Sequence, residues 1–111
     1  MSRVEVMIGG TVASRATPAR AFADALNAGI DCVVAVDDLV VLASPLDRRT
    51  AFVDVFIGHG STQTRWMLLD PERSRKGYAV SFRFASSMLR RVSRQGRIPP
   101  RVAECMHWRP L

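Results

Sequence analysis

The sequence predicts an α+β fold, in which an antiparallel or mixed sheet of five to six strands carries two to three packed helices. The first supporting observation is the segment Cys32–Ala43, whose dense run of valine, leucine and alanine is typical of buried strands. The second is a set of short segments in which apolar and polar residues alternate, as in half-buried strands. The third is the helical spacing of apolar residues after Pro18 and towards the C-terminus. Residues 1–111 are expected to form a single globular domain, because this length suits one hydrophobic core.

The N-terminal part is predicted to be a strand followed by a helix. In Arg3–Ile8 a valine or isoleucine stands at every second position, which indicates one buried face. Gly9-Gly10 predicts a bulge or a turn, after which Thr11–Ala13 can continue the strand. The helix Pro18–Ala28 has Thr17 as its expected N-cap, a proline at its first position and a glycine just beyond its end.

Two hairpins are predicted in the middle of the chain. Asp37-Asp38 divides the central apolar run, and because aspartate tolerates a positive φ, we favour a tight hairpin there over one kinked strand. Ala51–Ile57 and Arg65–Leu69 alternate on either side of the polar loop Gly58–Gln63, which indicates a second hairpin. Asp54 stands between two phenylalanines in this hairpin, so we expect it to pair with an arginine or to titrate abnormally.

Residues 78–85 fit two patterns, and the sequence leaves both open. Aromatic and β-branched side chains at alternate positions favour a strand. The apolar spacing from Tyr78 to Val92 also suits one long helix. We favour the strand, because the aromatic content is high and a glycine precedes the segment.

The C-terminal third is expected to hold two helices. Ser86–Gln95 is helical under either interpretation of the preceding residues, with Ser86 or Ser87 as its N-cap and a glycine at its end. A last short helix is expected over Pro100–His107, because two prolines break the chain before it. Trp108 is expected to pack the tail back onto the domain.

The formal net charge of +6 is distributed unevenly along the chain. Residues 1–70 hold six arginines against eight carboxylates, a net charge of −2. Residues 71–111 hold nine arginines and Lys76 against two carboxylates, a net charge of +8. A GC-rich genome can explain why fifteen of the sixteen basic residues are arginine, but it does not explain why they gather at one end. The asymmetry predicts that the C-terminal part meets an anionic partner, most commonly nucleic acid.

The candidate site is a group of basic side chains on and around the predicted C-terminal helix. Guanidinium groups grip phosphates through paired hydrogen bonds, and several of them along one helix can follow a nucleic-acid backbone. We therefore expect a small basic binding module that contacts nucleic-acid backbone and is not an enzyme. The alternative is a protein–protein interaction module, such as an inhibitor or an assembly subunit encoded by a phage or plasmid, that docks its basic face on an acidic protein surface. The residues expected to make either contact are Lys76, Arg83, Arg90, Arg91, Arg94, Arg97 and Arg101.

Three other groups of residues carry weaker signals for chemistry. The glycine-rich loop 58–63 contains a histidine and two hydroxyl side chains, but no Walker spacing and no evident base with an orienting acid. Three carboxylates would suit a hard cation if they converged: Asp37, Asp38 and Asp54. Zinc-ligand residue types occur without paired spacing: Cys32, Cys105, His59 and His107. Turn chemistry, salt bridging and buried thiols explain the same residues, so we expect no catalytic residue, metal or cofactor.

The remaining expectations concern location and assembly. No apolar run reaches the ~18–20 residues that a membrane-spanning helix requires, and the N-terminus lacks a signal-peptide pattern. We therefore expect a cytoplasmic protein with no membrane partner. A homodimer is a further expectation, because an exposed sheet edge can pair with a second copy of the chain.

Overall fold

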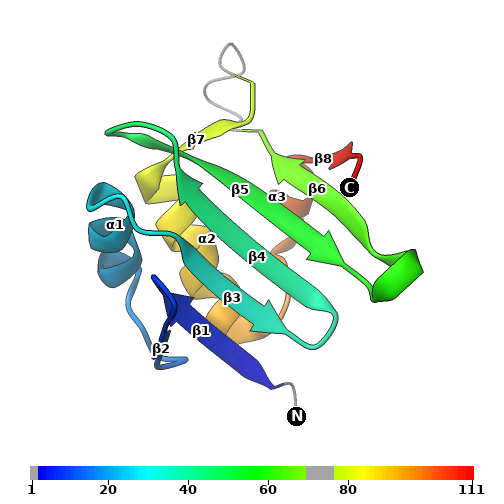
Figure 1. Cartoon of the computed structure of the whole chain (residues 1–111), viewed down its shortest axis with the longest axis horizontal. Helices are drawn as coiled ribbons and strands as arrows, with labels where there is room; N and C mark the ends of the chain where they lie inside the picture. The colour runs from blue at the N-terminus through cyan, green and yellow to red at the C-terminus, as the bar shows by residue number, and fades with distance from the viewer. Residues whose placement is uncertain (1–2, 70–76) are drawn as a thin grey trace.

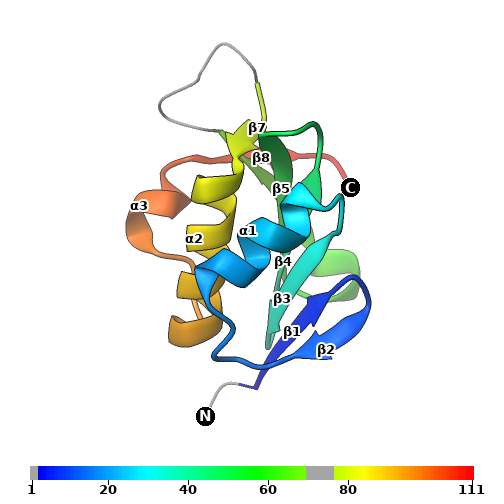
Figure 2. The ribbon, with the colours of Figure 1, turned by 90° about the vertical axis from the view of Figure 1, so that its left-hand side faces the viewer.

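One antiparallel sheet forms the frame of the molecule, and the helices cover one of its two faces (Figures 1 and 2). The computed structural model describes residues 3–69 and 77–111. The described strands are β1 (Val4–Ile8), β2 (Thr11–Ala13), β3 (Cys32–Val36), β4 (Leu39–Pro45), β5 (Thr50–Ile57), β6 (Thr64–Leu68), β7 (Ala79–Ser81) and β8 (Met106–Arg109). The described helices are α1 (Ala19–Asn27), α2 (Phe82–Gln95) and α3 (Pro100–Ala103), with a 3-10 turn at Gly60–Thr62.

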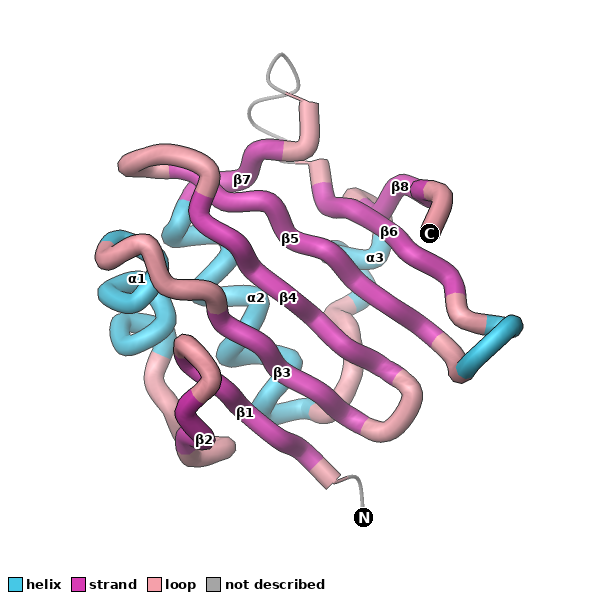
Figure 3. Tube along the Cα trace, in the orientation of Figure 1, coloured by secondary structure: helices cyan, strands magenta, loops and turns pink. Residues whose placement is uncertain are grey.

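The order of the strands is simple: β2-β1-β3-β4-β5-β6-β8, with β7 paired to one end of β5. Every pairing between neighbours is antiparallel. Figure 3 shows β3, β4 and β5 running side by side through the centre of the sheet. The predicted α+β class is confirmed. The predicted count of five to six strands is too low, because the described residues form eight.

Tight two-residue turns set the register of the first two hairpins. Gly9 and Gly10 have φ angles of 59° and 81°, as a type I′ turn requires, and they place Ile8 opposite Thr11. A Cβ atom on Gly9 would lie 2.8 Å from the Ile30 side chain, so this position has room only for glycine. Asp37 adopts a φ of 49°, and the hairpin predicted at Asp37-Asp38 is confirmed by the β3–β4 pairing.

The hydrophobic core lies between the inner face of the sheet and the two longer helices. Val34, Val41 and Val55 from three successive strands are fully buried there. They meet the apolar sides of α1 and α2, including Phe22 and Leu89. The burial of β3 alternates strictly along the strand, so the central apolar run is covered on only one of its faces.

The start of α2 resolves the ambiguity over residues 78–85. Three residues form β7, and the helix then begins at Phe82 rather than at Ser86, so the longer predicted strand is wrong. The cap is Ser81, whose hydroxyl accepts a hydrogen bond from the Phe84 amide at 3.0 Å. The predicted caps are wrong as well: Ser86 is buried within α2 and donates to the Arg83 carbonyl, and Ser87 is exposed within the same helix.

Two further expectations for the ends of helices are corrected. The hydroxyl of Thr17 donates to the Ser14 carbonyl at 2.6 Å, so it stabilises the turn before α1 and does not cap the helix. The last helix ends at Ala103. The following residues form β8, because the free edge of β6 offers backbone partners, with Trp66 opposite Trp108. The Trp108 side chain is 60% exposed, so it does not pack the tail onto the core.

We predict that Ser81→Ala lowers the free energy of unfolding by about 1 kcal/mol, because it leaves an amide in the first turn of α2 without its acceptor. Urea denaturation followed by circular dichroism measures this change. Ser87→Ala is the matched control, since it removes an exposed hydroxyl from the same helix, and it should leave stability unchanged within about 0.5 kcal/mol. Equal effects of the two substitutions would contradict the role of Ser81.

Candidate functional site

The outer surface of α2 carries the best candidate site. Its inner side is anchored in the core by Met88, Leu89 and Val92, which are buried. Arg83 and Arg94 are exposed on the opposite side, and Arg90 beside them is half-buried. At about 100° per residue these three positions fall within ~40° of one another around the helix, and they span ~16 Å along it. The sequence therefore places three guanidinium groups in one stripe on a rigid element.

The other predicted residues extend this stripe at its C-terminal end. Arg91 is exposed about a quarter of a turn away on α2. Arg97 follows the left-handed cap at Gly96, and Arg101 lies on α3, and both are exposed. Lys76 lies outside the described residues. We call the six placed residues the α2 arginine surface: Arg83, Arg90, Arg91, Arg94, Arg97 and Arg101.

Carboxylates do not neutralise the α2 arginine surface within residues 3–69 and 77–111. The ion pairs of these residues lie elsewhere: Arg3–Glu5, Arg20–Asp24, His59–Asp38 and Arg65–Asp54. The helix-bearing segments 15–28 and 82–104 hold eight arginines against Asp24 and Glu104, a net charge of +6. The clustering of charge predicted from the sequence is therefore a property of one layer of the fold.

Arg15 joins this surface, although sequence reasoning did not include it. Its Nε donates to the Ser93 carbonyl and its Nη2 to the Arg94 carbonyl, both at 3.0 Å. These are carbonyls of the last turn of α2, where a cation also interacts favourably with the helix dipole. The contact spans 78 positions in the sequence, so no local pattern could have indicated it.

The polar loop 58–63 closes the β5–β6 hairpin and does not assemble a catalytic group. His59 pairs with Asp38 from the neighbouring hairpin. The Thr62 hydroxyl donates to the His59 carbonyl at 2.7 Å. No contact between Ser61 and a base occurs among the described side chains. The loop is explained by turn chemistry, as its composition allows.

The three aspartates considered as a metal site are separated by the sheet. Asp37 and Asp38 form the tip of the β3–β4 hairpin. The Gly58 amide, just after β5, donates to the Asp38 carbonyl, and Asp54 lies four residues before Gly58, ~13 Å away along the strand. It accepts a 2.7 Å hydrogen bond from Arg65 Nε, which confirms the expected pairing with an arginine. No cluster of three or more metal-ligating side chains occurs in the part of the chain that the structure describes.

The two cysteines lie in different environments, and no disulfide joins them. Cys32 is fully buried on β3. Burial, with a smaller contribution from the Asp31 charge, raises the pKa of its thiol to about 11. Cys105 is half-buried at the end of α3, where its thiol donates weakly to the Arg101 carbonyl.

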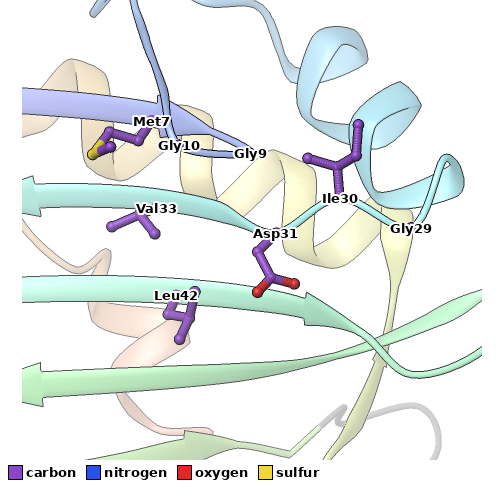
Figure 4. Close-up of a pocket in the computed structure, with 8 residues that line it drawn as sticks. All are labelled: Met7, Gly9, Gly10, Gly29, Ile30, Asp31, Val33 and Leu42. Carbon is purple, nitrogen blue, oxygen red and sulfur yellow. The ribbon is translucent and has the colours of Figure 1, made fainter.

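A shallow hollow lies on the face of the sheet that the helices leave uncovered (Figure 4). Its volume is about 520 Å³. Met7, Val33 and Leu42 from β1, β3 and β4 form its floor. Two glycine-containing turns form its wall, and the Asp31 carboxylate points over its rim in Figure 4. The hollow is apolar with a single acidic group, so it is poorly suited to an anion.

Comparison with known proteins does not assign the chain to a family. Neither a protein-family model, nor a curated protein, nor a solved structure matches the chain. Within the described ranges 3–69 and 77–111, no helix is both long and apolar enough to cross a membrane.

We predict that a thiol reagent at pH 8 modifies native Cys105 at least about 100-fold faster than native Cys32. With its pKa near 11, only about one in a thousand Cys32 thiols is ionised at this pH, and burial blocks access to it. Mass spectrometry after timed labelling measures both sites. In a Cys105→Ser variant, Cys32 should react only after unfolding, and rapid labelling of folded Cys32 would contradict its placement.

Proposed function

We propose that the protein is a small basic module that binds the backbone of nucleic acid through the α2 arginine surface. The observation that carries the proposal is the stripe formed by Arg83, Arg90 and Arg94 on the outer side of α2. No carboxylate of the described residues pairs with this stripe. An anionic polymer is the ligand that satisfies several such guanidinium groups at once.

The rigidity of the helix supports this assignment. The buried side of α2 packs against the sheet and against α1, so the arginine stems start from fixed positions. Arg15 and the left-handed cap at Gly96 hold the C-terminal turn, next to Arg94. Binding then loses only side-chain freedom, because the backbone of the site is already ordered.

The chemistry of the site points to the backbone rather than to the bases. Duplex DNA carries one charge per ~1.7 Å of its axis, so the ~16 Å stripe faces on the order of ten phosphate charges. Phe82 and Phe84, the aromatic residues in the first turn of α2, are partly buried against the core, and their rings are not offered for stacking. Binding of this kind depends weakly on sequence and strongly on salt.

The decisive test is the double charge reversal Arg90→Glu with Arg94→Glu. Fluorescence anisotropy of a labelled 25-base-pair duplex at several salt concentrations measures binding. Four to six phosphate contacts predict a slope of about −4 to −5 for log K against log salt. The variant should bind at least about tenfold more weakly at low salt, and its slope should be shallower by about 2.

The matched control is Arg48→Glu with Arg49→Glu, which changes the net charge equally at two exposed residues between β4 and β5. Circular dichroism should show both variants folded. An equal loss of affinity in the control would mean that total charge, and not the α2 arginine surface, governs binding. If duplex DNA, single-stranded DNA and RNA all fail to bind even at low salt, the proposal is wrong, and an acidic protein surface becomes the remaining partner for this face.

A further inference from the structure

The uncovered face of the sheet is more apolar than an exposed sheet face should be. Antiparallel sheets with one wet face normally alternate apolar and polar residues. On β3 and β4 four of the five outward positions break this rule, because they hold Val33, Ala35, Val40 and Leu42, and only Ser44 is polar. In Figures 1 and 3 none of the described helices lies in front of this face. A continuous apolar surface of this kind usually marks an interaction site.

We propose that this face packs against the same face of a second copy of the chain, about a two-fold axis that runs along β4. The inference does not depend on the proposed function, since the helices and the α2 arginine surface lie on the other face of the sheet. We infer a second copy as the partner because the pattern of residues across the strands is complementary to itself under this rotation.

The first row across the sheet carries the argument. Strand registers place one residue of each strand side by side, in the order Glu5, Ala35, Val40, Phe56 and Arg65. A two-fold axis along β4 places this row of one copy against the same row of the second copy, with the order of the strands reversed. Val40 then meets Val40, the small Ala35 meets the large Phe56, and Glu5 meets Arg65. Each of the last two contacts occurs twice, as an isologous interface requires.

The neighbouring row is compatible with the same axis. Its members are Met7, Val33, Leu42, Asp54 and Met67. Leu42 meets Leu42, and Met7 meets Met67. Asp54 would face Val33, but its carboxylate is only 13% exposed and already pairs with Arg65. The buried acid therefore adds no unpaired charge to the interface.

The distribution of charge selects this axis over one that crosses the strands. On the uncovered face, the β1–β3 side holds Glu5, Asp31 and Asp37 against Arg3, a net charge of −2. The β6–β8 side holds Arg65 and Arg109 against Asp54, a net charge of +1. An axis across the strands would set acid over acid. The axis along β4 sets Glu5 of each copy over Arg65 of the other, and arginine is long enough to bridge the offset that a ~30° sheet twist introduces.

The area is sufficient for a specific dimer. Five strands of about six residues present on the order of 500 Å² per copy at ~4.8 Å between strands and ~3.3 Å per residue. The two copies together then bury about 1,000 Å² before side-chain relief is counted, which is the area that separates biological interfaces from most crystal contacts. The hollow beside Met7 and Leu42 increases the available contact area, because a side chain of the second copy can fill it.

The test is the mass of the native chain in solution, measured by light scattering at about 100 μM. The proposal predicts twice the chain mass of 12.3 kDa. Val40→Arg places two cations together on the axis and should raise the dimer dissociation constant at least about tenfold. Ser87→Arg adds the same charge on α2 and should leave the dimer intact. A monomeric native chain at this concentration, or a Val40→Arg variant whose dissociation constant in a dilution series equals that of the native chain, overturns the proposal.

A near-isosteric substitution tests the orientation without disturbing the fold. In a Cys105→Ser background, Val40→Cys places two thiols together across the axis. Because facing sheets lie ~10 Å apart, a disulfide cannot join the two backbones, but a bifunctional thiol linker of about 6 Å should join the two thiols and give a covalent dimer on denaturing electrophoresis. Val33→Cys lies one strand from the axis, so its two thiols are separated by about twice the ~4.8 Å strand spacing and should not cross-link. Equal cross-linking at both positions, or none at Val40→Cys, contradicts the axis along β4.

Discussion

The packing of two helices against one face of an eight-stranded sheet is the constraint on which the rest of the structure depends. A sheet of this width has two faces, and among the described residues α1 and α2 cover only one. Val34, Val41 and Val55 are therefore buried, while Val33, Val40 and Leu42 on the same strands remain partly accessible. The same packing fixes which side of α2 faces outward, and thereby gathers its arginines on the opposite side of the molecule from the apolar sheet face.

Much of the fold follows from local patterns in the sequence. The β3–β4 hairpin was predictable because Asp37 tolerates the positive φ that the turn needs. The core-facing and outward-facing residues of β5 were predictable because Val53 and Val55 alternate with Phe52 and Phe56. The errors occur where residues that are distant in the sequence determine the secondary structure of a segment. Phe82 joins α2 after only three strand residues, and its amide donates to the carbonyl of Arg49, which precedes the neighbouring strand β5. The chain after Ala103 becomes a strand because the edge of β6 is free to pair.

The candidate site was predictable in part for the same reason. Arginines that recur along one amphipathic helix must share its outer side once the apolar side is buried, so the sequence located Arg83, Arg90 and Arg94 together. It could not locate Arg15, whose contact with the end of α2 exists only after the chain has folded. It also indicated that Cys32–Ala43 forms buried strands, without showing which face is covered. The strand registers show that half of this run faces away from the helices, and that Ala35 and Val40 share a row with Glu5.

The central claim is that the two faces have different roles, with the helix layer binding a polyanion and the sheet face binding an apolar surface. Backbone amide chemical shifts of the ¹⁵N-labelled chain, recorded during titration with an unlabelled DNA duplex, test it most directly. The account predicts that the shifts concentrate in residues 82–97 and around Arg15, and that Val33, Val40 and Leu42 on the outer face of the sheet do not move. Shifts centred on β3, β4 and β5 would contradict it.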